Sequence, residues 1–259
     1  MKIAITGKGG VGKTTLSAVL SHLYAAEGKR VIAVDADPDA NLAAALGISP
    51  SVLSKLRPIA EMSDLIEERT GARPGKSGGI FKLNPRVDDI PEEFGLRFGN
   101  IVLLIIGKSK EAASGCYCPE NVFLRRLLKH LIIDRNEIVI VDMEAGIEHL
   151  TRGTAEAVDA FIVVVEPGQR SIQTANIVRD MAKTLGTKRV FVVANKVRGE
   201  RDIKFIRENL PSDMEFVGSI NFDHEIMEAD LSGVSPASIK SCSESIETIK
   251  KEIEKRIAG

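Results

Sequence analysis

The feature that most constrains the fold is a glycine-rich segment near the N-terminus, Gly7-Lys8-Gly9-Gly10-Val11-Gly12-Lys13-Thr14-Thr15. It follows the apolar run 3–6 and precedes a helical pattern, so it matches G-x-x-x-x-G-K-[ST] in the strand–loop–helix setting that this motif requires. Glycines allow successive backbone N–H groups to surround an anion, and the helix adds the positive end of its dipole. The segment therefore predicts a phosphate-binding site.

The side chains of this loop have distinct predicted parts in binding Mg²⁺ and ATP. Lys13 is expected to reach the β- and γ-phosphates, and Thr14 is expected to hold Mg²⁺ through its hydroxyl group. The other positions expected to bind nucleotide are those whose backbone N–H groups surround the phosphates, namely Gly9, Gly10, Val11, Gly12 and Thr15.

A second lysine, Lys8, directly follows the first glycine of the loop. The segment thereby resembles the deviant Walker A form, K-G-G-x-G-K-[ST], of the nitrogenase iron protein, the MinD and ParA positioning ATPases, Mrp-type iron–sulfur carriers and nickel-insertion ATPases. The resemblance implies an ATPase that forms a homodimer face to face around ATP. It also implies that Lys8 crosses the interface and stabilises charge in phosphoryl transfer, as an arginine finger does.

Composition limits the compartment and the partners. The 259 residues include 35 Lys and Arg and 36 Asp and Glu, which gives a formal net charge of −1 and no overall attraction to nucleic acid. No signal peptide is recognisable, no apolar run approaches the ~20 residues that span a bilayer, and the three cysteines form no disulfide framework. We expect one cytoplasmic domain over residues 1–259, with no nucleic-acid and no membrane partner.

Short apolar runs alternate with amphipathic patterns, which predicts an α/β fold with a doubly wound, mostly parallel sheet and helices on both faces. The apolar runs predict strands at Lys2–Thr6, Arg30–Asp35, Ile101–Ile106, Glu137–Asp142, Ala160–Glu166, Arg189–Asn195 and Glu215–Ile220. The amphipathic patterns predict helices at Lys13–Glu27, Asp39–Leu46, Ile59–Thr70, Pro119–Ile132, Ser171–Leu185, Asp202–Asn209 and Ser243–Ile257.

Two further segments need an interpretation. The irregular stretch 71–100 is rich in glycine and proline, and we expect an insertion with a short strand at Gly79–Leu83. It is either a lid or partner surface, or simple surface elaboration. The last helix repeats isoleucine every three or four residues, and its polar face mixes Glu and Lys without an aromatic anchor. We therefore expect it to pack on the sheet and not to bind a membrane.

Two predicted strands end in aspartate at the edge where ligands of doubly wound sheets bind. The first is followed by Asp35-Ala36-Asp37-Pro38-Asp39-Ala40-Asn41, and the second ends in Asp142-Met143-Glu144-Ala145-Gly146. These segments resemble switches I and II of the deviant Walker family. The resemblance implies that Asp37 positions the attacking water, Asn41 senses the γ-phosphate, Asp142 contacts the water shell of Mg²⁺ and Gly146 moves towards the γ-phosphate.

The segment Asn195-Lys196-Val197-Arg198 ends another predicted strand. It resembles the N-K-x-D loop with which GTPases read guanine, but Arg198 stands where the aspartate would be. Arginine has no acceptor for the guanine N1 and N2 protons, so the segment favours ATP over GTP. Asn195 is expected to face adenine, and Lys196 is expected to bind nucleotide beside it.

Cys116 and Cys118 are separated by one residue, and Pro119 and Glu120 then begin a helical pattern. Thiolates are stabilised at a helix N-terminus, and two of them bind soft metals such as Ni²⁺ or Zn²⁺. One pair supplies only half of a four-ligand shell, so a two-fold dimer would supply the other half. Two buried structural thiols or a redox dithiol are the alternatives.

Taken together, the motifs resemble the CooC-type nickel-insertion ATPases over nearly the whole chain. The resemblance rests on the phosphate loop, D-x-D-P-D, G-C-Y-C-x-E-N at 115–121 and D-M-x-A-G-I-E-H-L-T-R-G-T at 142–154. It implies a homodimer that carries metal on Cys116 and Cys118, hydrolyses ATP and matures carbon monoxide dehydrogenase or acetyl-CoA synthase. His149 lies in the last of these motifs and is expected either to line the interface or to serve a surface or packing role.

Two other classes stay open at this point. An iron–sulfur scaffold or carrier of the Mrp type would use C-x-x-C, usually near the C-terminus, and this chain does not have that pattern there. A MinD- or ParA-like positioning ATPase would not need the cysteine pair. An iron-containing protein after anaerobic isolation would favour the first class, and ATP-dependent sedimentation with liposomes or DNA would favour the second.

Overall fold

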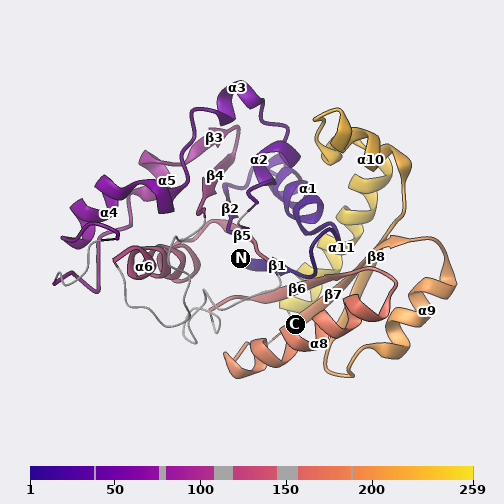
Figure 1. The fold of residues 1–259 in the computed structure, drawn as a ribbon. Helices are drawn as coiled ribbons and strands as arrows, with labels where there is room; N and C mark the ends of the chain where they lie inside the picture. Colours follow the sequence, from indigo (N-terminus) through magenta and orange to yellow (C-terminus); the bar gives the residue numbers. More distant parts are fainter. Residues whose placement is uncertain (38, 76–79, 108–118, 145–156, 188, 259) are drawn as a thin grey trace.

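The computed structural model describes residues 1–37, 39–75, 80–107, 119–144, 157–187 and 189–258. Its centre is an eight-stranded sheet with the order β3-β4-β2-β5-β1-β6-β7-β8 (Figure 1). Neighbouring strands are parallel except for the β3–β4 pair at one edge, which is antiparallel. The predicted doubly wound, mostly parallel sheet is therefore confirmed.

Apart from β3, which no apolar run predicted, the strands lie close to the predicted bounds. They are β1 (Lys2–Thr6), β2 (Val31–Asp35), β3 (Leu96–Phe98), β4 (Ile101–Ile105), β5 (Ile138–Asp142), β6 (Ala160–Val165), β7 (Val190–Val197) and β8 (Glu215–Asn221).

The described helices cover both faces of this sheet. The α-helices are α1 (Lys13–Ala26), α2 (Leu42–Ala45), α3 (Pro50–Leu53), α4 (Ser63–Thr70), α5 (Ile90–Glu93), α6 (Pro119–Ile133), α8 (Gln169–Thr184), α9 (Glu200–Asn209), α10 (His224–Leu231) and α11 (Lys240–Ala258). Two 3₁₀ turns, η1 (Ile59–Glu61) and η2 (Pro236–Ser238), complete the set.

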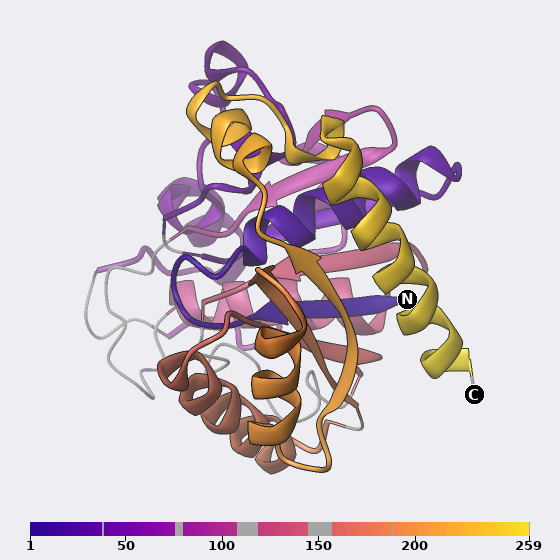
Figure 2. The same ribbon diagram turned by 90° about the vertical axis from the view of Figure 1, so that its right-hand side faces the viewer.

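Successive side chains of each strand point to opposite faces of the sheet, so the buried side chains form two cores. In β1, Ile3 and Ile5 belong to the core beneath α1 and α11, whereas Ala4 belongs to the core beneath α6 and α8. The two layers of helices lie on opposite sides of the sheet (Figures 1 and 2). Because both faces are covered, the central strands read as nearly continuous apolar runs.

The C-terminal helix packs as the isoleucine spacing predicted. Ile246, Ile249 and Ile253 of α11 are buried in the same core as α1. Lys250 is also buried, and its Nζ lies 2.7 Å from Glu27 Oε1 and 4.5 Å from the centre of the Tyr24 ring. The apolar face of α11 is therefore used inside the fold.

The strand expected at Gly79–Leu83 is wrong. Residues 80–83 form no strand, and Gly79 lies outside the described residues. The strand of this region is instead β3, which forms a hairpin with β4 through Gly99 (φ 59°) and Asn100 and places Leu96 opposite Leu103. Three residues of strand are too few to give a period-two signal in the sequence.

Two expected helices are shorter than the amphipathic patterns suggested. The helix expected at Ile59–Thr70 is interrupted at Met62 (φ −84°, ψ 66°), which separates η1 from α4. The helix expected at Asp39–Leu46 begins only at Leu42, because the preceding backbone turns around an aspartate. The Asp35 carboxylate accepts hydrogen bonds from the N–H groups of Asp37 and Leu42, at 3.3 Å and 2.9 Å.

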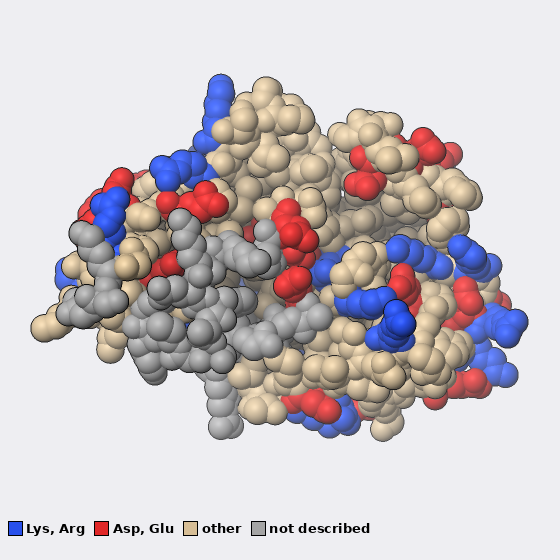
Figure 3. Space-filling model, in the orientation of Figure 1, with Lys and Arg blue, Asp and Glu red and all other residues tan. Residues whose placement is uncertain are grey.

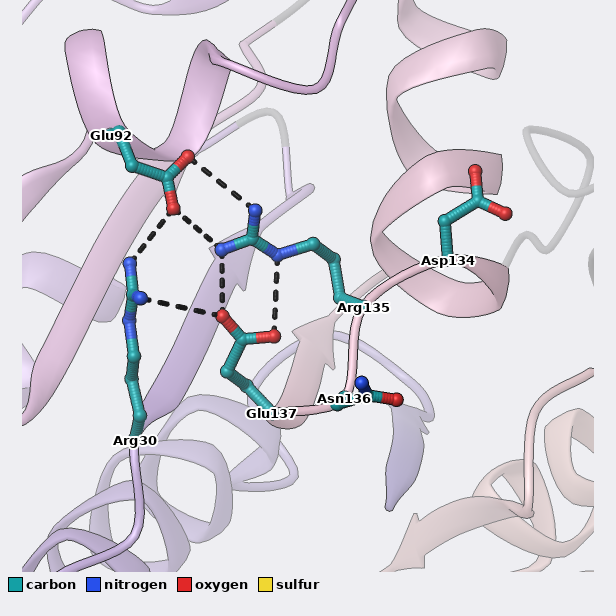
Figure 4. Close-up of a pocket in the computed structure, with 6 residues that line it drawn as sticks. All are labelled: Arg30, Glu92, Asp134, Arg135, Asn136 and Glu137. Atoms are coloured by element: carbon teal, nitrogen blue, oxygen red, sulfur yellow. Dashed lines mark hydrogen bonds and ion pairs between the residues drawn. The ribbon is translucent and has the colours of Figure 1, made fainter.

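The amino-terminal edge of the sheet carries a closed network of charges (Figure 4). Arg135 Nη2 lies 2.6 Å from both Glu92 Oε1 and Glu137 Oε1, and Arg30 lies 2.9 Å from Glu92 and 3.6 Å from Glu137. Lys2 adds hydrogen bonds from its Nζ to the carbonyl groups of Arg135 and Glu137. The two arginines and the two glutamates are all paired, and Lys2 bonds to backbone carbonyl groups, so this edge holds together β1, β5 and the residues before β2.

Candidate nucleotide site

The glycine-rich segment forms the loop between β1 and the start of α1, as the motif requires. Gly12 has φ 97°, and a Cβ there would overlap the side-chain amide of Asn195. Gly7 has φ 148°, and a Cβ there would overlap the carbonyl oxygen of Val164. The close approach of neighbouring atoms, and not only loop flexibility, therefore demands glycine at both positions.

Lys13 begins α1 and is only 6% exposed. Its Nζ lies 3.7 Å from Asp37 Oδ2, and the Asp37 side chain is 14% exposed. The loop after β2 thus brings the predicted water-positioning aspartate against the predicted phosphate-binding lysine. Asn41 stands at the N-cap position of α2 without a side-chain capping hydrogen bond and is exposed, so its side chain is accessible.

Two buried aspartates lie side by side below the glycine-rich loop. Asp35 and Asp142 occupy paired positions on the parallel strands β2 and β5, and both are fully buried. Burial and, to a smaller extent, the nearby Asp142 raise the pKa of Asp35 to about 7, against the hydrogen bond from Leu42. Burial raises the pKa of Asp142 to about 6, against the effects of Thr14 and Lys13.

The surroundings of Asp142 fit a divalent cation. Neither of its carboxylate oxygens makes a hydrogen bond within the described structure, although both are buried. The Thr14 hydroxyl is close enough to lower the pKa of Asp142. A carboxylate and a hydroxyl at the start of the loop helix are the oxygen ligands that Mg²⁺ uses beside nucleotide phosphates.

The end of β7 supports the loop from the side. Asn195 is buried, and its Nδ2 donates a hydrogen bond of 2.8 Å to the Val11 carbonyl, while its Oδ1 accepts one from Lys196 N. Lys196 has φ 57°, an unusual value for a residue with a side chain, and its Nζ donates to the Gly10 carbonyl at 2.6 Å. Both residues therefore fix the loop, and contact of Asn195 with adenine stays a prediction.

Sequence reasoning missed Glu166, which follows β6. Its carboxylate lies 3.8 Å from Lys8 Nζ and 3.5 Å from Lys196 Nζ, so it links the signature lysine to the end of β7. The Lys8 side chain remains 40% exposed. An acidic residue at the carboxyl end of a predicted strand was the available signal, because ligand-binding residues gather at that edge.

The second switch begins where β5 ends. Thr6 Oγ1 donates a hydrogen bond of 2.6 Å to the carbonyl of Glu144, which joins the strand before the loop to the segment after Asp142. Gly146 and His149 lie outside the described residues, as do Cys116 and Cys118. Within the ranges that the structure describes, no cluster of three or more His, Cys, Asp or Glu side chains fits a metal ion.

The fold and the loop together define a P-loop nucleotide-binding protein. Residues 2–237 match the family model of the CobQ/CobB/MinD/ParA nucleotide-binding domain. The chain belongs to this family, and it is an ATPase of the deviant Walker A class.

The most informative relative among curated proteins is the carbon monoxide dehydrogenase accessory protein CooC of Rhodospirillum rubrum. It is 50% identical over 235 residues, which cover 91% of this chain and 89% of that protein. An ATP-binding protein of Methanocaldococcus jannaschii is 44% identical over 98% of this chain and 95% of its own length. The resemblance to CooC that the motifs predicted is thereby confirmed.

Solved structures confirm the fold. A ParA family ATPase of Chlorobium tepidum superposes with a TM-score of 0.69 at 18% identity, covering 97% of this chain and 98% of its own. MinD of Pyrococcus horikoshii, solved with Mg-ADP, gives a TM-score of 0.67 at 20% identity and covers 100% of this chain and 97% of its own. Separately, none of the helices in the described ranges has the length and apolar character needed to cross a membrane.

Proposed function

We propose that this protein is an ATP-hydrolysing nickel chaperone that matures the nickel–iron–sulfur site of carbon monoxide dehydrogenase or acetyl-CoA synthase. The observation that carries the proposal is the 50% identity to the accessory protein CooC over 91% of the chain. Residues 1–259 would act as one cytoplasmic domain, and two copies would form a homodimer around ATP.

Lys13, Thr14 and Asp142 carry the nucleotide half of the proposal. When bound, Mg²⁺ would neutralise charge on the phosphates, and Thr14 and Asp142 would hold it and its waters. Lys13 would contact the β- and γ-phosphates, with backbone N–H groups of Gly9 to Thr15 around them. Side chains beside these three residues would orient the attacking water and respond to the γ-phosphate.

The Lys13–Asp37 ion pair supports a coupling between binding and catalysis. Asp37 Oδ2 lies 3.7 Å from Lys13 Nζ. A phosphate group would take its place beside Lys13 and leave the Asp37 carboxylate to orient the attacking water. Asn41 and Gly146 would respond to the γ-phosphate from the two switches, and Lys8 of one subunit would act on the nucleotide of the other.

The metal half of the proposal rests on Cys116 and Cys118, which directly precede α6 in the sequence. We propose that both pairs of a homodimer hold one Ni²⁺ as cargo through four thiolates, a set that also accepts Zn²⁺. ATP binding would close the dimer and reshape this site, and hydrolysis would relax it. Metal affinity should therefore depend on the nucleotide state.

The first test is an anaerobic Ni²⁺ titration of metal-free protein beside a Cys116→Ser/Cys118→Ser variant and a matched Cys242→Ser control, since Cys242 is buried in α11. We expect one nickel per two chains in the wild type and the control, and none in the double variant. Weak binding that ignores the double substitution would remove the metal site from the proposal.

A second test addresses the coupling. The Asp37→Ala variant should bind ATP without hydrolysing it, which would hold the dimer in one state. We expect its nickel affinity with ATP to differ from that without ATP. Equal affinities in wild type and variant would leave an ATPase without nucleotide-controlled metal delivery.

A further inference from the structure

The helix α10 presents an apolar surface that the fold does not use. Met227 is 52% exposed, Leu231 is 80% exposed and Val234, just beyond the helix, is 47% exposed. Met227 and Leu231 are four residues apart and share one face of the helix. Ala229 is the buried residue of α10 and turns to the opposite side. We call Met227, Leu231 and Val234 the α10 patch.

Acidic side chains lie beside the α10 patch. Glu225, Glu228 and Asp230 are exposed, and α10 contains neither Lys nor Arg. None of the three forms an ion pair with the described residues, whereas α9 and α11 both carry ion pairs between residues four apart. The lobe at the upper right of Figure 3, over α10, shows red side chains and no blue ones.

The patch is connected to the nucleotide switch through α2. The Asp35 carboxylate holds the N–H of Leu42 at the start of α2, at 2.9 Å. At the other end of α2, the Ala45 carbonyl accepts a hydrogen bond of 2.6 Å from Ser235 Oγ, and Ser235 directly follows Val234. The segments around α2 and α10 lie side by side in both ribbon views (Figures 1 and 2). A short, hydrogen-bonded path therefore joins Asp35 to the patch.

The position of α10 suits a contact made from the nucleotide side. Because β8 runs parallel to β7, the carboxyl end of β8 lies at the same side of the sheet as the phosphate loop. Two residues separate β8 from α10, so α10 lies at that side as well. Exposed apolar groups inside a charged rim are typical of protein interfaces. The acidic rim repels phosphate-rich surfaces, so it disfavours nucleic acid and anionic membranes.

We propose that the α10 patch is the docking surface for the client protein, and that the client presents an apolar side chain flanked by Lys or Arg. The proposal rests on the proposed function, since it takes the client to be the enzyme that receives nickel. Opposite charges would steer the two proteins together, and the apolar contact would retain them. The hydrogen-bonded path from Asp35 through α2 to Ser235, which we call the α2 path, would allow the nucleotide state to change the affinity for the client.

The test measures binding of purified, nickel-free carbon monoxide dehydrogenase to immobilised full-length protein by biolayer interferometry. We expect Met227→Ser/Leu231→Ser to weaken binding at least about tenfold, as loss of central apolar contacts does. Glu228→Lys should weaken it and reduce its salt dependence. The controls are Ile177→Ser on α8, where Ile177 is 59% exposed, and Glu208→Lys on α9, both expected to stay within about twofold.

Each contrary result has a definite meaning. If the wild type binds the enzyme and the α10 variants bind equally well, docking occurs elsewhere and the proposed function stands. If the wild type binds neither this enzyme nor acetyl-CoA synthase in any nucleotide state, both proposals fail. If the variants instead lose ATP-dependent dimerisation in sedimentation, the patch is an interface between two copies, which overturns the docking proposal. Unchanged basal ATP hydrolysis and melting temperature would show that the variants fold.

A second variant tests the connection to the switch. Ser235→Ala removes the hydrogen bond to Ala45 and leaves the patch itself in place. We expect wild-type affinity for the enzyme to differ by about fivefold between the ADP and ATP states, and Ser235→Ala to remove most of that difference. A difference that persists in Ser235→Ala would overturn the α2 path.

Discussion

Buried charges are paired at the amino-terminal edge of the sheet, where the strands begin, whereas the buried carboxylates of the carboxyl edge, where the strands end, form no ion pair within the described structure. At the amino-terminal edge, Arg135 and Glu137 are 15% and 16% exposed, and each has a partner of opposite charge. At the carboxyl edge, Asp142 is fully buried and neither of its oxygens accepts a hydrogen bond within the described structure. The paired charges at the amino-terminal edge stabilise the fold, whereas the unpaired Asp142 lowers its stability until a ligand binds.

The same difference appears in the pKa values. Burial alone would raise the pKa of Glu137, but the hydrogen bonds and charge of Arg135 lower it below its usual value. Burial raises the pKa of Asp35 and Asp142 because no cation compensates it fully. Buried carboxylates that form no ion pair within the described structure therefore mark the functional edge of this sheet.

The largest expected effect is on catalysis at the carboxyl edge. Lys13→Ala should lower ATP turnover by about 100- to 1,000-fold, because it removes the cation that would face the phosphates. The measurement is steady-state phosphate release, with Lys29→Ala, an exposed lysine just after α1, as the matched control. Turnover within a few fold of the wild type would remove Lys13 from the catalytic machinery.

Asp142→Asn should separate stability from activity. At pH 7.5, the nucleotide-free variant should gain about 1–3 kcal/mol in free energy of unfolding, because it removes a buried, unpaired charge. It should also lose most of the extra stability that the wild type gains from Mg²⁺ and ATP. Urea denaturation with and without Mg²⁺-ATP measures both effects, and a variant less stable than the wild type would contradict the comparison.

The pH dependence follows from the raised pKa values. Between pH 4 and the folded values of about 6 and 7, the folded state binds protons that the unfolded state has released. The contribution of these two groups to stability is therefore present at low pH and is lost as the pH rises through that window. Urea denaturation from pH 5.0 to 7.5 should show a shallower decline in Asp142→Asn than in the wild type. Parallel declines would mean that Asp142 is ionised throughout.

The smallest expected effect lies at the amino-terminal edge. Glu137→Gln keeps the shape of the side chain but removes its charge, so the protein should lose about 1 kcal/mol of stability. ATP turnover should stay within about twofold of the wild type, since the nucleotide site lies at the other edge. A turnover loss comparable to that of Lys13→Ala would show that the two edges are not independent.

Local sequence patterns predicted much of this molecule. The phosphate loop follows from residues 7–15, because its glycines and its lysine act within a few residues of one another. The strand and helix order follows from apolar runs and amphipathic periods, which depend only on neighbours in the chain. Errors arose where a segment was too short to show a period, as in β3, or where a side chain redirected the backbone, as Asp35 does before α2.

What the sequence determined by itself was the class of fold, the phosphate loop and the family, because each is written in contiguous residues. Only the tertiary structure decided which distant groups meet. It brought Glu166 to Lys8, Asn195 to Gly12 and Asp35 to Asp142. The physical reason is that strand order in a parallel sheet is set by long-range packing, and no local pattern specifies which strand ends become neighbours.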